Sequence, residues 1–283
     1  MTKNYSKIMM LAVALMASLA SFAETKIDGI FYNLDSEKLQ AQVTFQQAQV
    51  TFDGSATAFT YTGAVTIPQT VSFQGKDYTV TSIGEMAFFE NIGLTSVTIP
   101  NSVTAIGDKA FNSCRSLTSI EIPSTVVTIG EGAFGCDVST YGPVIMSFAV
   151  DAANANYASD GSLLTNKAGD TVYGFASAKA NLVIPEGVTT IANYGLSGSK
   201  LSNVRTIALP NTLTTIGDYG IFGQTNVASI SIPSSVTYVG SDAFGKWEAK
   251  QTVSFHCTRD YALVNFAPRY SADCSAKITY LGE

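Results

Sequence analysis

The feature that most constrains this chain is a short motif that returns about every 23 residues. Isoleucine or leucine followed by proline closes a short run of alternating apolar and polar residues at six places: Pro68, Pro100, Pro123, Pro185, Pro210 and Pro233. The intervals between these prolines are 32, 23, 62, 25 and 23 residues. A repeated interval of this length is typical of a protein built from stacked structural units.

Two further markers keep the same interval. The first is an apolar residue followed by a small one, at Ile83-Gly84, Ile106-Gly107, Ile129-Gly130, Ile191-Ala192, Ile216-Gly217 and Val239-Gly240. The second follows it closely, at Ala87-Phe88, Ala110-Phe111, Ala133-Phe134, Ile221-Phe222 and Ala243-Phe244. Because three markers recur together, we interpret each interval as one structural unit, which we call a rung.

Each rung is predicted to start with a short β-strand. Residues 97–100, 120–123, 207–210 and 230–233 alternate with the period of a strand and are rich in β-branched residues. Proline ends each strand because it has no N–H for the next ladder bond. The glycine then turns a corner. After it, the pattern of residues 107–111 predicts a single helical turn with its N-terminus capped by Asp108.

The rungs carry a resemblance. Residues 117–123, Leu-Thr-Ser-Ile-Glu-Ile-Pro, followed by residues 127–134, Val-Thr-Ile-Gly-Glu-Gly-Ala-Phe, resemble the BspA-type leucine-rich repeat of secreted bacterial surface proteins. The similarity extends over about residues 60–255. It implies a curved solenoid with parallel strands, export to the cell surface or beyond, binding to other proteins such as host or matrix glycoproteins, and no catalytic residues. Ala192 at the corner and Gly195-Leu196 after it depart from the motif.

The predicted fold is therefore a β-dominated leucine-rich-repeat solenoid of short parallel strands and one-turn helices. β-rich caps are expected at both ends, because an open rung exposes apolar surface and a sheet edge. We expect a signal peptide at residues 1–23, an N-terminal β cap at 24–80, repeats at 81–252 and a C-terminal cap at 253–283. The 62-residue interval predicts a β-hairpin inserted at about residues 145–181.

The N-terminal segment predicts export. Lys3 and Lys7 precede an apolar run, and Ser21-Phe22-Ala23 places small residues where signal peptidase cleaves. The alternative is a membrane anchor, but the run is shorter than the roughly 20 residues of a spanning helix. No membrane span is expected after cleavage at Ala23. The protein is expected to be extracellular or on the cell surface, with the periplasm as the alternative.

Charge and composition exclude several function classes. Sixteen basic residues against 22 acidic ones, a net charge of −6 and a pI near 4.8 argue against nucleic acid as a partner. His256 is the single histidine, so a serine or cysteine hydrolase would depend on the C-terminal cap, and no nucleophile motif lies near it. We expect no enzymatic activity and no cofactor.

A row of polar residues follows the corners. It consists of Glu85, Asp108, Glu131, Asn193, Asp218 and Asp242. Calcium binding is one interpretation, but side chains stacked on one face supply too few ligands for an ion that takes six to eight oxygens. The favoured interpretation is that each side chain caps its own helical turn.

Two binding surfaces are predicted from the strands and the insertion. Outward strand positions would present a face to a protein partner: Thr98, Glu121, Val183, Ala208, Ser231 and Ser254. Alternatively, polar and aromatic residues of the insertion would bind a glycan: Asn154, Asn156, Tyr157 and Tyr173. The plainer interpretation of these four residues is that they hold the hairpin onto the solenoid. A third hypothesis is a structural component of the cell envelope with no soluble ligand.

Export would permit disulfides. Cys257 and Cys274 both lie in the C-terminal cap, and Cys114 and Cys136 lie 22 residues apart, which predicts neighbouring rungs. The alternative for Cys114 is a free buried thiol at a repeat position where a small side chain is expected.

Overall fold

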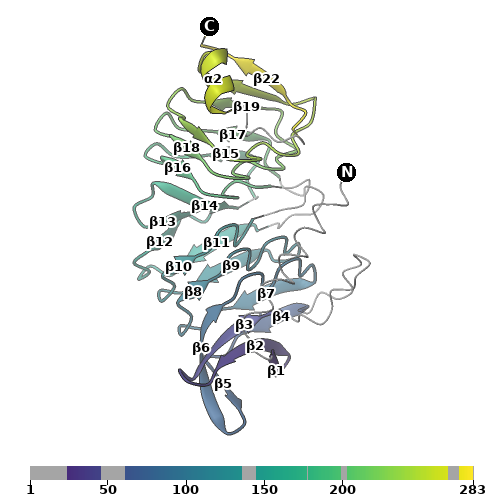
Figure 1. Cartoon of the computed structure of the whole chain (residues 1–283), viewed down its shortest axis with the longest axis vertical. Helices are drawn as coiled ribbons and strands as arrows, with labels where there is room; N and C mark the ends of the chain where they lie inside the picture. Colours follow the sequence, from purple (N-terminus) through teal and green to yellow (C-terminus); the bar gives the residue numbers. More distant parts are fainter. Residues whose placement is uncertain are drawn as a thin grey trace.

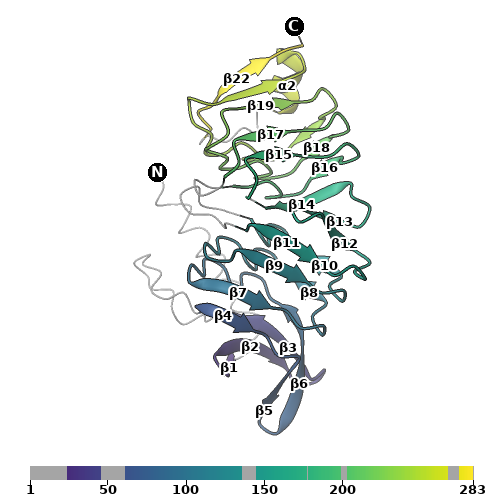
Figure 2. The same ribbon diagram turned by 180° about the vertical axis from the view of Figure 1, so that it is seen from behind.

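The structure is a computed structural model that describes residues 24–45, 61–135, 145–176, 178–198, 203–266 and 274–282. The predicted signal peptide and Cys136 lie outside these residues. The described chain forms an elongated stack of rungs, with the N-terminal strands at one end and the C-terminal helix at the other (Figures 1 and 2). The predicted solenoid is confirmed, because successive proline-ended strands lie side by side and parallel.

Each rung contributes a strand to two layers. The first layer holds the proline-ended strands and their continuation: β4 (Gly63–Thr66), β7 (Leu94–Thr98), β9 (Ser119–Ile122), β11 (Ser147–Val150), β15 (Asn181–Val183), β17 (Thr206–Ala208), β19 (Ser229–Ile232), β21 (Thr252–Phe255) and β22 (Lys277–Tyr280). The second layer holds the strands before the corners: β6 (Lys76–Ile83), β8 (Ala105–Ile106), β10 (Thr128–Ile129), β14 (Thr171–Phe175), β16 (Thr190–Ile191), β18 (Thr215–Ile216) and β20 (Tyr238–Val239). The pairing within both layers is parallel: the first layer consists of the sheets β4–β7, β9–β11, β15–β17 and β19–β21–β22, and the second of the runs β6–β8–β10 and β14–β16–β18–β20.

Proline and glycine set the path of each rung. The carbonyl of Pro100 accepts a hydrogen bond from the N–H of Val103, so the chain turns directly after the strand, and Pro123 and Val126 repeat this contact. The corner glycines allow close stacking. A Cβ added at Gly107 would lie 2.6 Å from the backbone nitrogen of Glu85, and one at Gly240 would lie 2.3 Å from that of Asp218. Only glycine fits such a corner.

The segment after each corner is not the helical turn that the sequence predicted. Residues at alternate positions donate to the next rung, as Met86 N–H does to Asp108 and Phe88 N–H to Ala110. Positive φ angles break the helix at two positions four residues apart in the same rung, 54° at Met86 and 53° at Glu90. The N–H groups that lie between the donors to the next rung bond three residues back in the same rung, as Phe89 N–H does to Met86, so the segment is a series of turns linked to the next rung. The one-turn helices of the prediction are wrong for the described rungs.

Apolar side chains fill the space between the two layers. The rings of Phe88, Phe111 and Phe134 stack along the axis, with centroids 5.0 and 5.7 Å apart. All three are buried, as are the isoleucines and valines that point inward from the strands. The core divides into two clusters, one up to the insertion and one beyond it. The repeat therefore buries one face of each rung against its neighbours, which is how a solenoid gains its stability.

Antiparallel strands close the N-terminal end. β1 (Thr25–Ile27), β2 (Ile30–Asp35) and β3 (Gln40–Thr44) form a meander, and β5 (Thr70–Phe73) forms a hairpin with β6. β3 then pairs with β6 in parallel, which joins the meander to the second layer. Tyr61 fastens this end, because its hydroxyl accepts from Phe31 N–H and donates to the carbonyl of Thr44.

The inserted segment is shorter than the predicted residues 145–181. β11 pairs with β9 as a regular first-layer strand, and β14 pairs with β16 as a second-layer strand. Between them, β12 (Tyr157–Ser159) and β13 (Leu163–Asn166) form an antiparallel sheet with β14. Strands β10 and β14 do not pair, so the second layer is interrupted. We call the junction between residues 129–135 and residues 192–198 the seam.

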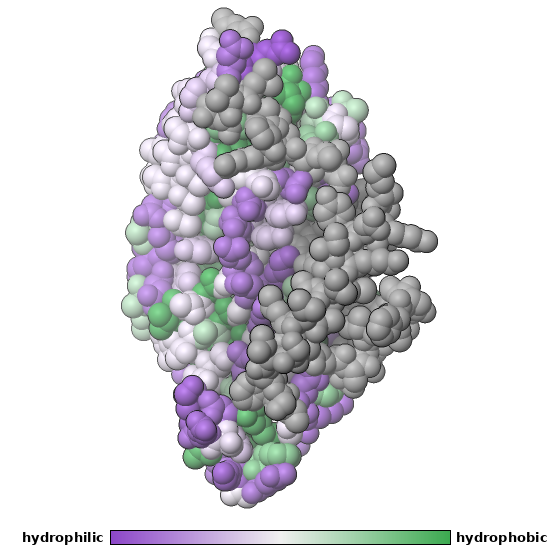
Figure 3. Space-filling view, in the orientation of Figure 1, coloured by the Kyte–Doolittle hydropathy of each residue, from purple (hydrophilic) through white to green (hydrophobic). Residues whose placement is uncertain are grey.

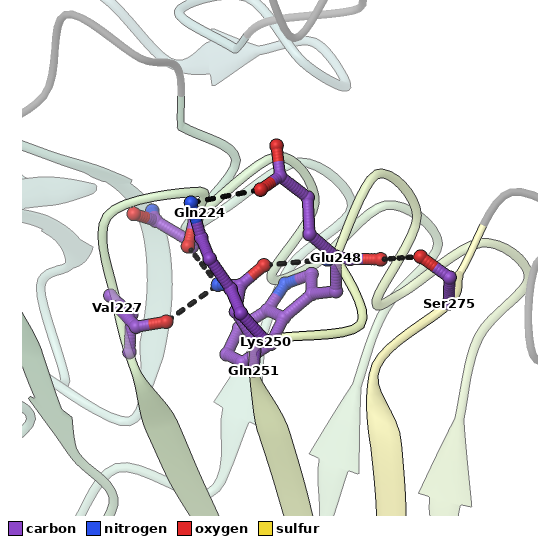
Figure 4. Close-up of polar contacts among 7 residues, drawn as sticks. Gln224, Val227, Glu248, Lys250, Gln251 and Ser275 are labelled. Carbon is purple, nitrogen blue, oxygen red and sulfur yellow. Dashed lines mark hydrogen bonds and ion pairs between the residues drawn. The ribbon is translucent and has the colours of Figure 1, made fainter.

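At the C-terminal end the parallel first layer continues through β21 and β22, with the helix α2 (Arg259–Asn265) between them. Gln251 is fully buried, and its amide nitrogen donates to the carbonyls of Gln224 and Val227 at 2.9 and 2.5 Å. Its amide oxygen accepts from Glu248 N–H (Figure 4). The Gln251 side chain thus satisfies two backbone carbonyls and one backbone N–H, and it holds the turn that precedes β21.

Candidate functional site

The outward positions of the first layer lie side by side within each of its sheets, β4–β7, β9–β11, β15–β17 and β19–β21–β22. Strand register places Thr66 beside Thr98, Glu121 beside Ala149, Val183 beside Ala208, and Ser231 beside Ser254. We call this surface the serine–threonine face. Its members, exposed or half-exposed, are Ala64, Thr66, Ser96, Thr98, Ser119, Glu121, Ser147, Ala149, Asn181, Val183, Thr206, Ala208, Ser229, Ser231, Thr252, Ser254, Lys277 and Thr279.

The face is almost free of charge. Glu121 and Lys277 are its only ionisable members, and they lie on strands far apart in the stack. Hydroxyl side chains pair across strands, as Ser254 Oγ and Thr279 Oγ1 do at 2.7 Å. Val183 stands out as the most exposed large apolar residue, with 64% of its surface accessible. Short side chains keep this surface flat, with many hydroxyl donors and acceptors and little charge.

The second layer offers a less suitable surface. Its outward positions are also mostly threonine, among them Thr189, Thr190, Thr214 and Thr215. The space-filling view shows pale residues, close to neutral hydropathy, over the side where β16 and β18 lie (Figure 3). However, the parallel strands β8, β10, β16, β18 and β20 are two residues long, whereas the strands of the first layer are three to five residues long. The first layer provides the wider face.

A hollow of about 390 Å³ opens in the serine–threonine face near its C-terminal end. Its walls come from three consecutive rungs, with Ala208 and Asn211 on one side, Ser231 and Pro233 in the middle and His256 on the other. The hydroxyl of Ser231 and Nε2 of His256 lie 2.6 Å apart. Because β19 and β21 place Ser231 beside Ser254, His256 follows two residues later and reaches back over the neighbouring strand.

The Ser231–His256 pair joins two residues that sequence reasoning kept apart. Position 231 was predicted as part of the binding face, and His256 as the residue on which a serine or cysteine hydrolase mechanism would depend. Among the described residues, no carboxylate hydrogen-bonds to His256. A Ser–His–Asp arrangement needs that third group to orient the imidazole. The geometry suits a polar contact in a binding surface, because the Ser231 hydroxyl and the His256 imidazole can each donate or accept a hydrogen bond.

The insertion residues proposed for glycan binding are mostly committed to the fold. Asn154 is buried, and its amide nitrogen donates to the carbonyls of Pro123 and Val126. Tyr157 is 7% exposed, and its hydroxyl accepts from Ile129 N–H at 2.8 Å. This bond satisfies a backbone donor on the β10 edge that the interruption of the second layer leaves unpaired. The predicted glycan site at Asn154 and Tyr157 is therefore wrong, whereas Tyr173 remains half-exposed.

The predicted cap disulfide is also wrong in this structure. Cys257 and Cys274 are free thiols. Parallel pairing of β21 with β22 aligns Thr252 with Lys277, so Cys274 lies before one end of this strand pair and Cys257 beyond the other. The four paired residues of each strand alone extend about 10 Å at roughly 3.3 Å per residue and lie between the two cysteines, whereas a disulfide needs Cα atoms within about 7 Å.

Cys114 is a free, buried thiol at the end of a turn. Its Sγ lies 2.9 Å from the carbonyl oxygen of Phe88 in the preceding rung. Burial raises the pKa of the Cys114 thiol to about 12, so the group is protonated at neutral pH. The predicted partner, Cys136, lies outside the described residues.

The polar row after the corners links one rung to the next. Asp108 Oδ1 accepts from Glu131 N–H at 2.9 Å, Asn193 Oδ1 from Asp218 N–H at 2.8 Å, and Asp218 Oδ1 from Ser241 N–H at 2.7 Å. These three side chains thus cap backbone N–H groups of the following rung, and the prediction that each member of the row caps its own turn is wrong for them. Ser241, one residue before the predicted Asp242, occupies the last position of the row. Within the described ranges, no three acidic, histidine or cysteine side chains gather as metal ligands would.

Comparisons with known proteins agree with this architecture. The family model described as the BspA type leucine rich repeat region matches residues 55–141 and 169–265, in six copies. The chain belongs to the BspA-type leucine-rich repeat family. It contains the parallel strands, proline ends and glycine corners that the resemblance implied. In the described residues, the one helix, α2, is too short to cross a membrane.

Solved structures of bacterial leucine-rich repeat proteins are similar to this chain. A leucine-rich repeat protein from Eubacterium ventriosum is 20% identical, with a TM-score of 0.50 over 82% of this chain and 72% of that one. A leucine rich cell surface protein from Faecalibacterium prausnitzii is 17% identical, with a TM-score of 0.45 over 93% of this chain and 96% of that one. No curated protein matches this sequence. The first of these similarities supports the fold alone.

Proposed function

We propose that this protein is a secreted or surface-exposed binding scaffold that presents the serine–threonine face to a protein or glycoprotein partner. The observation that supports the proposal is the row of mostly small, mostly uncharged side chains that the register aligns within each sheet of the first layer, β4–β7, β9–β11, β15–β17 and β19–β21–β22. Stacked rungs give an extended rigid surface without a catalytic group. Function then depends on the shape and hydrogen bonds of this surface.

The hollow beside Ser231 and His256 supports the same proposal. Binding energy in protein interfaces concentrates in a few residues that enter pockets, surrounded by a rim that excludes water. A hollow of about 390 Å³ on an otherwise flat face is a place for one such side chain of the partner. In this proposal Ser231, His256 and Asn211 supply polar contacts in the hollow, and Val183 supplies apolar contact area further along the face.

The proposal includes export and the absence of enzymatic activity. Export rests on the predicted signal peptide and on the family, whose resemblance implies surface proteins. N-terminal sequencing of protein recovered from the outside of the producing cell is expected to start at Glu24. A chain found only inside the cell with residues 1–23 intact would contradict export.

The binding surface can be tested by substitution. The triple variant Thr98→Lys, Ala208→Lys and Ser231→Lys adds three charges to the face, and Val127→Lys, Thr214→Lys and Thr237→Lys adds the same charge to exposed positions of the second layer. Both proteins and the wild type would be used to capture partners from host extracellular matrix and from the cell envelope. We expect the first variant to lose a captured protein that the second keeps. Equal capture by both variants would overturn the assignment of the face.

A purely structural role in the envelope is the alternative. It predicts that the wild type captures no extracellular matrix protein and co-purifies with envelope material. The capture experiment separates the two hypotheses, because the matrix and envelope arms are read independently.

A further inference from the structure

The seam contains a second hollow, of about 240 Å³, at the corner where the regular stacking of rungs is interrupted. Its walls are residues 129–132 on one side and Ala192 and Asn193 on the other, with Tyr173 of β14 between them. In regular rungs the corner glycine packs directly on the preceding rung, as Gly130 does on Asp108. Ala192 carries a Cβ at the equivalent position, and its N–H bonds to the carbonyl of Val172 of β14, as the corner N–H groups of regular rungs bond to the preceding second-layer strand. The missing element is the pairing of β10 with β14, and the hollow lies where these two strands do not pair.

The interruption also leaves hydrogen-bonding groups without protein partners. In the polar row, Asp108, Asn193 and Asp218 each cap the next rung, whereas in the described structure no such bond joins Glu131 to Asn193 across the seam. The Glu131 carboxylate is exposed at the hollow. Asn193 uses its amide oxygen for Asp218 N–H, which leaves its amide NH2 group to donate. An acceptor and a donor thus line the same small space.

We propose that this seam hollow binds a single neutral sugar ring. Sugar hydroxyls can donate to the Glu131 carboxylate and accept from the Asn193 amide, and the apolar face of the ring can rest on the half-exposed ring of Tyr173. A few convergent polar groups around an aromatic side chain are the usual make-up of a small-ligand site. This site differs from the one first predicted on the insertion, because it uses Tyr173 but neither Asn154 nor Tyr157.

Other ligands fit the seam hollow less well. A metal ion would find one carboxylate among its lining residues, too few for calcium. An anion would meet the Glu131 carboxylate in a protein of net charge −6. An extended peptide would need the N–H groups of the β10 edge, and the hydroxyl of Tyr157 already accepts from Ile129 N–H. A neutral polyhydroxylated ring needs none of these features.

The test is a titration of the ¹⁵N-labelled protein, residues 24–283, with individual sugars followed by NMR. The panel contains glucose, galactose, mannose, fucose, N-acetylglucosamine and N-acetylgalactosamine, with glucuronate as the anionic comparison. We expect at least one neutral sugar to shift the amide signals of Gly130, Gly132 and Ala192 in the millimolar range typical of a small ligand. Glucuronate is expected to shift them less.

Substitutions make the result specific. Glu131→Gln removes the charged acceptor and is expected to weaken the best sugar about tenfold, since hydrogen bonds to charged groups contribute most. Glu85→Gln changes the equivalent position of another rung, away from the hollow, and is expected to bind like the wild type. If no neutral sugar shifts these amides, or if Glu131→Gln and Glu85→Gln bind equally, the proposal is overturned. If a short unstructured peptide shifts the amide signals of the seam and no sugar does, the sugar proposal is overturned in favour of peptide binding.

This outcome is independent of the serine–threonine face. The seam hollow lies in the second layer and at its corner, whereas the three-lysine variant alters the first layer. Sugar binding by that variant should therefore equal that of the wild type. If the three-lysine variant folds but loses both partner capture and sugar binding, the two sites are not separate.

Discussion

Phe88 and Phe111, at equivalent positions of neighbouring rungs, lie with their ring centroids 5.0 Å apart and their planes 4° from parallel. Phe134 continues the stack at 5.7 Å from Phe111. This contact explains why the Ala-Phe marker keeps the interval of the proline marker. In the first half of the solenoid each of these rings meets the ring of the next rung, and the alanine before it leaves the backbones free to approach.

Removal of the middle ring tests this contact. Phe111→Ala is expected to lower the free energy of unfolding by about 3–5 kcal/mol, because the cavity would be flanked by two rings that cannot both relax into it. Phe111→Leu keeps most of the volume and is expected to cost about 1–2 kcal/mol. Urea unfolding followed by circular dichroism gives both values. Equal loss in the two variants would show that ring stacking is not what holds the rungs together.

The polar row should contribute one hydrogen bond per rung where the side chain is short enough to reach. Asp108→Ala removes the bond to Glu131 N–H and is expected to cost about 0.5–1.5 kcal/mol, while Asp108→Asn keeps an acceptor and should cost less. Glu85 makes no such bond among the described residues, so Glu85→Ala should stay within about 0.5 kcal/mol of the wild type. A larger effect from Glu85→Ala than from Asp108→Ala would contradict the hydrogen bonds between rungs.

Tyr157 is expected to be essential for joining the insertion to the first half of the solenoid. Tyr157→Phe keeps the ring but leaves Ile129 N–H without a partner, at a cost of about 1–3 kcal/mol. Tyr173→Phe removes a hydroxyl that makes no hydrogen bond to the described residues and serves as the matched control. Hydrogen exchange at Ile129 should accelerate in the first variant alone, and unchanged exchange there would refute the contact.

Much of this fold can be predicted from sequence, and the failures have physical causes. The prolines and glycines predict strand ends and corners because each acts through its own backbone geometry. The turn after the corner could not be predicted, since some of its partners are N–H and C=O groups of another rung, and a local pattern such as residues 107–111 fits a helical turn equally well. The extent of the insertion was missed because β11 and β14 lack the proline and glycine markers, although their residues alternate as strands do.

The candidate sites, like the fold, could be predicted from the sequence only in part. Strand alternation predicts which residues, such as Thr98 and Ser231, point outward, and register confirms their alignment. His256 beside Ser231 depends on the alignment of β19 with β21, which sequence spacing of 25 residues alone does not signal. For the seam hollow there was one signal: Ala192 stands where the repeat has glycine, and that substitution marks a corner that lines the hollow.

Alkaline pH should weaken the fold through Cys114. Burial raises the pKa of this thiol from its ordinary value of 9.0 to about 12. Between these values the unfolded chain loses the proton and the folded chain keeps it, so stability that is fully present below pH 9.0 falls as pH rises, by about 1.4 kcal/mol per pH unit. Cys114→Ser removes this contribution, and the stability difference between the two proteins should shrink from pH 8 to pH 11 in urea unfolding. Parallel curves would contradict the buried thiol.

Partner association should depend little on salt. The serine–threonine face has two ionisable residues, Glu121 and Lys277, on distant strands, so long-range steering of a charged partner is weak. Once a captured partner is available, its association rate measured by surface plasmon resonance should change less than about threefold between 50 and 500 mM salt. A steep fall with salt would point to a charged surface elsewhere on the molecule.

The most direct test of the account is hydrogen exchange of the whole chain with and without a captured partner, read by mass spectrometry. The account predicts that binding slows exchange in peptides that contain β7, β9, β17 and β19, the strands of the serine–threonine face. Protection confined to β8, β16, β18 and β20, with the first layer unchanged, would contradict it.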